Sequence, residues 1–129
     1  MVLDTSAIVA ILFDEPPRRT LTEAIEVDTV RLISAATLLE SALVVEARRG
    51  EPAGRELDLL LHRAAVNTVP VSADNVEIAR RAWRRYGKGR HPAALNFGDC
   101  FSYALARSSG EPLLFVGDDF PNTDIPAAV

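Results

Sequence analysis

The chain opens with the stretch Met1-Val2-Leu3-Asp4-Thr5-Ser6-Ala7. Its first three residues form a short apolar run that ends at Asp4, which is typical of a buried strand. Thr5 and Ser6 follow directly, and either side chain can cap a helix that runs to about Phe13. This opening predicts a buried strand that passes straight into a helix and leaves a carboxylate at the strand end.

The same alternation continues along the chain. Further helices are expected over residues 16–27, 35–49, 52–64, 72–87 and 96–109. Ser34, Ser72 and Asn96 provide side-chain caps at helix starts, and Gly50 and Gly110 provide stops. Further strands are expected over residues 31–33, 66–71 and 113–116, and the proline at position 70 indicates an edge strand.

Short apolar strands that alternate with helices predict an α/β fold. We expect three α/β/α layers, with a short parallel sheet of four to five strands covered by helices on both faces. The crossovers between parallel strands should be right-handed. A length of 129 residues suits one domain, residues 1–129.

The composition narrows the class of protein. Apolar residues make up 48% and charged residues 25%, as in globular proteins in water. The single cysteine, Cys100, excludes an intrachain disulfide and fits a reducing compartment. No export signal and no apolar run long enough for a bilayer are visible, so we expect a cytoplasmic protein without a membrane partner.

Carboxylates gather at the expected strand ends. Asp4 follows the first strand, and Asp118 and Asp119 follow the last. In parallel sheets, ligands bind beyond the carboxyl ends of the strands. Glu40 lies in a helix that is apolar almost all round, so we expect it to be largely buried, and Asp99 lies in the first turn of its helix. Asp4, Glu40, Asp99 and one of residues 118 and 119 are therefore expected in one cleft.

Several carboxylates in one cleft repel each other and need a cation, and oxygen ligands select Mg²⁺ or Mn²⁺. Such a site suits phosphodiester hydrolysis. We assign Asp4, Glu40, Asp99 and Asp119 as catalytic metal ligands, with Asp118 as a further candidate ligand. Adjacent side chains in extended chain point to opposite sides, so only one of residues 118 and 119 is expected to face the cleft. Asp119 is preferred because Phe120, which follows it directly, can pack under the loop and hold Asp119 toward the metal.

Each carboxylate also has a purely structural interpretation. Asp4 can cap the first helix, and Glu40 can pair with a buried arginine. Asp99 comes three residues after Asn96, where an acidic side chain favours a helix N-terminus. One residue of the pair 118–119 can be an ordinary turn residue.

The net charge of −4 and pI near 5.1 count against a nucleic-acid binder. However, six of the fourteen Lys and Arg residues lie between positions 80 and 90. They are Arg80, Arg81, Arg84, Arg85, Lys88 and Arg90. This basic stretch is predicted to bind RNA phosphates near the acidic cleft, and its alternative role is a solvated helix face.

Four motifs together resemble one family, and they span essentially the whole chain. They are residues 1–7, Leu39-Glu40, residues 96–106 and residues 113–120. In order and spacing they resemble the PIN-domain family, and within it the VapC branch, the toxins of toxin–antitoxin pairs. One departure is Gly117, where many relatives have Asp or another polar residue, so the fourth acidic position lies at 118 or 119.

The resemblance implies a Mg²⁺-dependent endoribonuclease that cuts structured RNA such as tRNA. It also implies a homodimer that is held inactive by a small VapB-type antitoxin. The acidic residues of the family carry over to Asp4, Glu40, Asp99 and one of residues 118 and 119. Thr5, Ser6 and Asn96 would support the site through hydrogen bonds.

Two other functions remain open from the sequence. A metal-dependent phosphatase of Rossmann-like fold usually has a second Asp two residues after the first, where this chain has Ser6. A PIN-like binding module would keep the fold without catalysis, although the complete set of carboxylates argues against it. A receiver-type domain fits poorly because Lys88 is the only lysine.

Overall fold

The computed structural model describes all 129 residues. The strands are β1 (Val2–Leu3), β2 (Leu32–Ser34), β3 (Asn67–Val69) and β4 (Leu113–Leu114). The helices are α1 (Thr5–Leu12), α2 (Arg18–Val27), α3 (Ala35–Arg49), α4 (Glu51–Arg63), α5 (Ala73–Tyr86) and α6 (Phe97–Ser109). A short 3₁₀ helix, η1 (Phe120–Asn122), follows β4. No helix is both long and apolar enough to cross a bilayer.

The four strands form one parallel sheet in the order β3-β2-β1-β4. Val2 pairs with Leu32 on one side and with Leu113 on the other, so β1 lies inside the sheet. β3 is an edge strand, as the proline at position 70 predicted. The prediction of a short parallel sheet in an α/β/α sandwich is confirmed.

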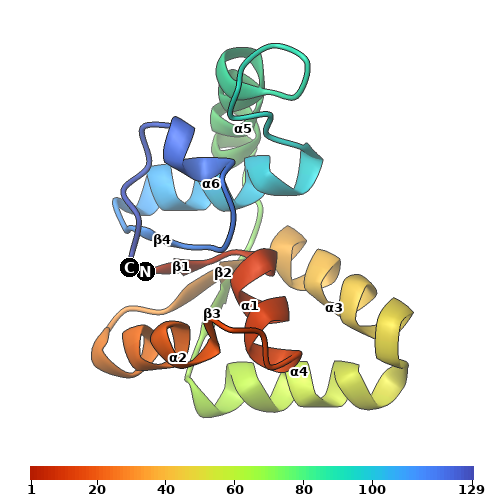
Figure 1. Ribbon diagram of the computed structural model, residues 1–129. Helices are drawn as coiled ribbons and strands as arrows, with labels where there is room; N and C mark the ends of the chain where they lie inside the picture. The colour runs from red at the N-terminus through yellow and green to blue at the C-terminus, as the bar shows by residue number, and fades with distance from the viewer.

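Helices cover both faces of the sheet, with α5 and α6 above it and α1, α2 and α4 below it in Figure 1. Neighbouring residues of one strand point to opposite faces. Val2 and Leu113 therefore belong to the core under α5 and α6, whereas Leu3 and Leu114 belong to the core with α1, α2 and α4. β1 and β4 thus each contribute to two apolar cores.

Most helix ends lie where the capping residues predicted them. Ser72 accepts a hydrogen bond from the Asn75 backbone, and Gly110 ends α6 in the left-handed conformation at φ 74°. The cap of α1 was predicted wrongly: it is Asp4, one residue before Thr5. A carboxylate is as good a helix cap as a hydroxyl, so the structural role expected as an alternative for Asp4 is real.

α3 differs from the prediction of a helix that is apolar and buried all round. Its buried residues are Thr37, Ser41 and Val45, which form one stripe at a spacing of four residues. Leu39 and Leu43 are exposed, at 61% and 60%. The helix lies at the flank of the sandwich (Figure 1), so only one side of it is covered. Glu40 lies beside this stripe and is therefore only partly buried.

Candidate functional site

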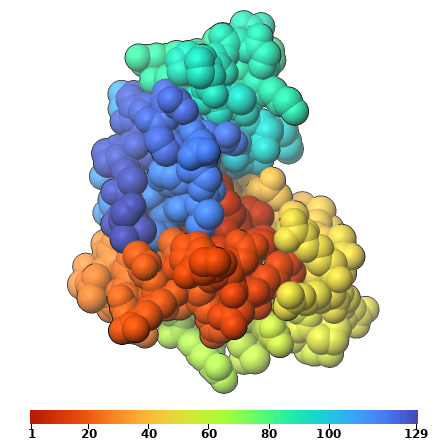
Figure 2. All heavy atoms as spheres, in the orientation of Figure 1, coloured from red at the N-terminus to blue at the C-terminus, as the bar shows by residue number.

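One pocket brings all five predicted carboxylates together. Its volume is about 440 Å³, and it lies beyond the carboxyl ends of β1 and β4. We call it the acidic pocket, and it is lined by Asp4, Glu40, Asp99, Asp118 and Asp119, among others. In Figure 2 the N-terminal segment, the start of α3, the start of α6 and the C-terminal segment meet here, in red, orange, cyan and blue. Four distant parts of the sequence therefore build one site.

Asp4 is the most tightly held of these side chains and is only 3% exposed. Its Oδ2 accepts hydrogen bonds from the backbone N of Ser6 at 3.0 Å and from the Ser6 hydroxyl at 2.6 Å. Its Oδ1 accepts a hydrogen bond from the Ser102 hydroxyl of α6 at 2.6 Å. The Ser6 hydroxyl oxygen also accepts from the backbone N of Val116, at 3.0 Å. Ser6 thus joins Asp4 to the segment after β4.

Glu40 is held by the hydroxyl group of Thr5 rather than by a cation. The Thr5 hydroxyl donates to Glu40 Oε1 at 2.5 Å and lies 3.1 Å from the Ser41 hydroxyl. Ser41 in turn donates to the backbone O of Thr37 at 2.8 Å. No arginine forms an ion pair with Glu40, so the alternative of a buried salt bridge is wrong.

Asp99 combines a structural and an electrostatic role. It forms a capping box with Asn96: its carboxylate accepts from the Asn96 backbone N at 3.0 Å, and its own backbone N donates to the Asn96 side chain at 2.9 Å. Its pKa is raised from 3.8 to about 7, first by burial and then by the charges of Asp4, Asp119 and Glu40. The hydrogen bond from Asn96 opposes the rise in pKa. The first turn of α6 therefore carries an acid whose ionised form is disfavoured.

Asp118 and Asp119 are both exposed and both line the acidic pocket. The expectation that only one of them faces the cleft is wrong, because the chain bends after β4, with Gly117 at φ +113°, and is no longer extended. Phe120 is buried and its ring lies 5.2 Å from that of Phe115, which anchors the bend. Of the two carboxylates, it is Asp119 whose charge raises the pKa of Asp99.

The carboxylates do not form a ready-made set of metal ligands. No three Asp, Glu, His or Cys side chains lie close enough together to hold an ion. Like charges repel, and three of these carboxylates are also held by hydroxyl or backbone donors of their own surroundings. The chemistry of the donor set nevertheless fits Mg²⁺ or Mn²⁺, since every acidic group that lines the pocket offers oxygen.

The basic stretch at residues 80–90 lies on the exposed surface of α5 and the loop after it, and none of its residues lines the acidic pocket. Part of its charge is already paired, since Arg80 lies 3.4 Å from Glu77. Arg90 lies over the ring of Trp83 at 4.2 Å. The stretch therefore forms no part of the pocket wall, and the binding of RNA by it near the carboxylates remains a prediction.

Four contributors to the acidic pocket were missed from the sequence. Glu15, in the loop after α1, is a sixth carboxylate that lines it. Arg48, near the end of α3, is the only basic residue that lines it. Ser102 is fully buried and bonded to Asp4, and the signal for it was a lone hydroxyl three residues after Asp99 in an apolar helix. Gly98 lies directly against the Glu40 carboxylate. Nothing in the sequence distinguishes it from a glycine that is present because of its backbone conformation.

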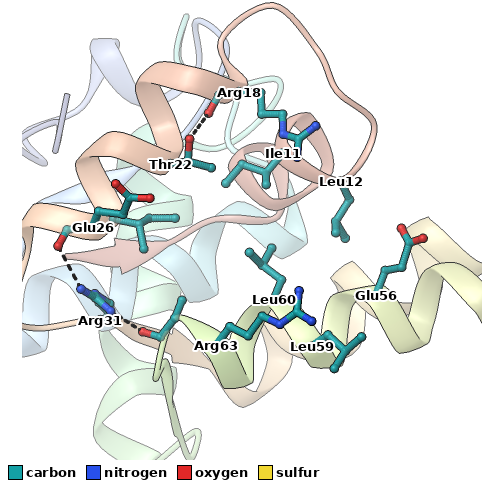
Figure 3. A pocket seen from close by; sticks show the side chains of 12 residues that line it. Ile11, Leu12, Arg18, Thr22, Glu26, Arg31, Glu56, Leu59, Leu60 and Arg63 are labelled. Atoms are coloured by element: carbon teal, nitrogen blue, oxygen red, sulfur yellow. Dashed lines mark hydrogen bonds between the residues drawn. The ribbon is translucent and has the colours of Figure 1, made fainter.

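A larger pocket of about 570 Å³ lies between α1, α2 and α4 (Figure 3) and contains none of the predicted site residues. Its lining mixes apolar and charged side chains. Arg31 is tied to the backbone O atoms of Ala64 at 2.7 Å and Glu26 at 3.2 Å, and Arg18 pairs with Asp14 at 3.0 Å. Arg31 and Arg18 therefore serve the structure, and the predicted site residues gather in the acidic pocket, which is the candidate site.

Comparison with known proteins agrees with this architecture. The family model for the PIN domain matches residues 1–126, and the protein belongs to the PIN-domain family. Its curated relatives include Ribonuclease VapC30 of Mycobacterium tuberculosis, which is 63% identical over 125 residues that cover 97% of this chain and 95% of the relative. Ribonuclease VapC of Mycolicibacterium smegmatis is 61% identical over 127 residues, 98% of each chain. Within the family, the chain therefore falls in the VapC branch.

A solved structure shows the same fold. The crystal structure of VapC20 of Mycobacterium tuberculosis, described as a sarcin-ricin loop cleaving toxin, superposes with a TM-score of 0.78 at 21% identity. The superposition covers 96% of this chain and 95% of that one. At this identity the likeness supports the three-layer fold, and the target of that toxin is a property of that protein.

Proposed function

We propose that this protein is a Mg²⁺-dependent endoribonuclease that hydrolyses phosphodiester bonds of structured RNA, such as tRNA, in the acidic pocket. The observation that carries the proposal is the meeting of five carboxylates from four chain segments in one pocket. The relatives in the VapC branch are named ribonucleases, which supports the same reaction class. Mn²⁺ is the expected substitute ion, because it accepts the same oxygen ligands.

In this proposal Asp4, Glu40, Asp99 and Asp119 hold the ion, and Asp118 lies at the edge of the site. A bound divalent ion would polarise the phosphoryl oxygen and lower the pKa of a water molecule. The carboxylates must then move closer together than they are in this structure. The opposing positive charge would favour the ionised form of Asp99, whose pKa is otherwise raised.

The other residues orient these ligands. Ser6 and Ser102 fix both oxygens of Asp4, and Thr5 fixes one oxygen of Glu40. Arg48 also lines the pocket and carries a charge opposite to that of the surrounding carboxylates. It can therefore bind a phosphate of the RNA backbone. The protein thereby supplies orientation before the substrate binds, which removes part of the entropic cost of the reaction.

Three further statements belong to the proposal. The partner would be a VapB-type antitoxin, as the names of the relatives in the VapC branch imply. A cationic side chain of that partner could pair with the acidic pocket and exclude the metal. A homodimer is expected from the same resemblance, and the exposed apolar Leu39, Leu43 and Phe97 are consistent with a covered surface. The site of action would be the cytoplasm.

The alternatives have less support. A phosphatase is disfavoured because the chain belongs to the PIN-domain family and its relatives are named ribonucleases. A binding module without catalysis gives no account of why Asp4, which is only 3% exposed, lines one pocket with four other predicted carboxylates.

The test is cleavage of a total tRNA preparation by the purified protein, with Mg²⁺ and with excess chelator, and with or without the co-expressed product of a neighbouring reading frame. Asp4→Asn should abolish cleavage and stay folded, because Asn caps helices as well as Asp does. Asp58→Asn, on the exposed surface of α4, is the matched control and should cleave normally. Undiminished cleavage in excess chelator, or by Asp4→Asn, would refute the mechanism. A bound partner that leaves cleavage unchanged would refute the antitoxin role.

A further inference from the structure

We infer that Gly98 is a positioning residue: because it has no side chain, it leaves the space that the Glu40 carboxylate occupies and so fixes where that carboxylate lies. This inference depends on the proposed function, in which Glu40 is a metal ligand. A Cβ atom added at Gly98 would lie 2.6 Å from Glu40 Cδ and 2.7 Å from Glu40 Oε1, and would overlap Glu40 Oε2. The carboxylate thus fills the space that any other residue would need for its own side chain.

The backbone does not require glycine at this position. Gly98 is the second residue of α6, inside a regular helix. Gly50, Gly110 and Gly117, in contrast, have φ values of 74°, 74° and 113°, which favour glycine. In a helix, alanine is more stable than glycine. The glycine at 98 therefore costs helix stability, and the space that it leaves for Glu40 is the compensating feature.

Two different helices contact the Glu40 carboxylate and fix its position. Thr5 on α1 donates to Glu40 Oε1 at 2.5 Å, and Gly98 on α6 lies against the same carboxylate. Asp99 is the next residue of α6 and lines the same pocket. The contact at Gly98 therefore sets how closely Glu40 can approach the turn that carries Asp99, and so how closely two proposed ligands of one ion can lie.

In Gly98→Ala the flexible end of Glu40 must move, since α6 and its cap at Asn96 are fixed by the capping box. The fold should survive and the carboxylate should be displaced. Residues that orient metal ligands typically cost roughly 10–100-fold in metal affinity when they are changed. A shorter acid at position 40 would not reach the added methyl group, so Glu40→Asp should partly rescue Gly98→Ala.

The chain offers a matched control at Gly54. A Cβ at that position would lie 2.8 Å from Cδ and Oε1 of Glu46, again a glutamate of α3, but neither residue lines the acidic pocket. Gly54→Ala therefore repeats the same kind of clash, glycine to alanine on a helix against a glutamate end, away from the site. Any general effect of such a clash should appear in both variants.

The experiment measures Mn²⁺ affinity by calorimetry, cleavage of tRNA with Mg²⁺, and the thermal unfolding temperature in chelator. It compares the wild type, Glu40→Gln, Gly98→Ala, Glu40→Asp, Gly98→Ala with Glu40→Asp, and Gly54→Ala. We expect Gly98→Ala to bind Mn²⁺ roughly 10–100-fold more weakly, to cleave correspondingly more slowly, and to unfold at the same or a higher temperature. The double variant should bind Mn²⁺ more tightly than Gly98→Ala, and Gly54→Ala should match the wild type in affinity and cleavage.

The outcomes separate this inference from the function on which it rests. If Glu40→Gln binds metal and cleaves RNA like the wild type, the proposed role of Glu40 fails and Gly98 has nothing to position. If Glu40→Gln is impaired but Gly98→Ala behaves as the wild type, the proposed function stands and the positioning role is overturned. A lower unfolding temperature for Gly98→Ala, or equal loss in Gly54→Ala, would also overturn it, because glycine would then serve the fold.

Discussion

Replacing Asp99 by asparagine should stabilise the protein while it removes a proposed metal ligand. The pKa of Asp99 is raised to about 7, chiefly by burial and by the charges of Asp4, Asp119 and Glu40, so the folded state disfavours its ionisation. An asparagine is nearly the same size and carries no charge. Its carboxamide oxygen can still accept the hydrogen bond that Asn96 donates to the carboxylate at 3.0 Å. The change therefore removes the repulsion and keeps the helix cap.

The sign of the effect follows from proton binding. Below its ordinary pKa of 3.8, Asp99 is protonated in both the folded and the unfolded state and does not change the free energy of unfolding. As the pH rises from there to about 7, the unfolded chain releases the proton and the folded chain keeps it, so the free energy of unfolding falls. A rise in pKa from 3.8 to about 7 is worth at most about 4 kcal/mol. Because Asp99 is partly exposed, water screens the charge, and we expect roughly 1–2 kcal/mol.

The assay is urea unfolding followed by circular dichroism in chelator, at about pH 5 and about pH 8, for the wild type, Asp99→Asn and Asp118→Asn. Asp99→Asn should be more stable than the wild type at both pH values, and the difference in the free energy of unfolding should be larger at about pH 8 than at about pH 5. Saturating Mg²⁺ should then stabilise the wild type more than Asp99→Asn, since only the wild type has the ligand. Asp118 is not among the carboxylates that raise the pKa of Asp99, so Asp118→Asn should follow the wild type. Parallel pH profiles for Asp99→Asn and the wild type would refute the reasoning.

Two more substitutions test the edges of the acidic pocket. Asp119→Asn should slow RNA cleavage about tenfold or more relative to Asp118→Asn, which is roughly the effect of losing one contact to the metal site. The reason is that the charge of Asp119, and not that of Asp118, raises the pKa of Asp99. Equal losses in the two variants, measured with both equally folded, would contradict this. Arg48→Ala should weaken RNA binding and reduce its dependence on salt by about one phosphate contact, since Arg48 is the only basic residue in the pocket. Arg84→Ala with Arg85→Ala, on the exposed surface of α5, provides the comparison, and a larger effect there would return RNA binding to the basic stretch.

The fold was predictable because its signals are local. Ser72, Asn96 and Gly110 act at helix ends through their nearest neighbours, and the alternation of apolar runs with helices defines the parallel sheet. The exposure of Leu39 and Leu43 was not predictable, because a helix sequence does not say how many of its sides other elements cover. That depends on the flank position of α3 in the finished sandwich.

The site was predictable at the level of the pocket and not at the level of its contacts. Strand ends bring Asp4 and the bend at residues 117–119 to one edge by topology alone, and the structure confirms that they line one pocket. The expectation that only one of Asp118 and Asp119 faces the cleft rested on an extended chain, whereas the chain bends at Gly117, which has a positive φ, and both residues line the pocket. Ser102 and Gly98 act across space on Asp4 and Glu40, and no periodicity reports such contacts.

The pairing of β1 with β4 means that the acidic pocket is complete only when the two ends of the chain are held together. Val2 lies beside Leu113, and Asp4 is bonded to Ser102, 98 residues further along the chain. Contacts between such remote positions close a long loop, and their entropic cost is recovered only when both partners are in place. A chain in which the segment after β4 has come loose can keep its lower core around Leu3, but it no longer holds Asp119 beside Asp4. The acidic pocket therefore needs both ends of the chain in place, and a molecule whose C-terminal segment is detached should lack the site proposed to cleave RNA.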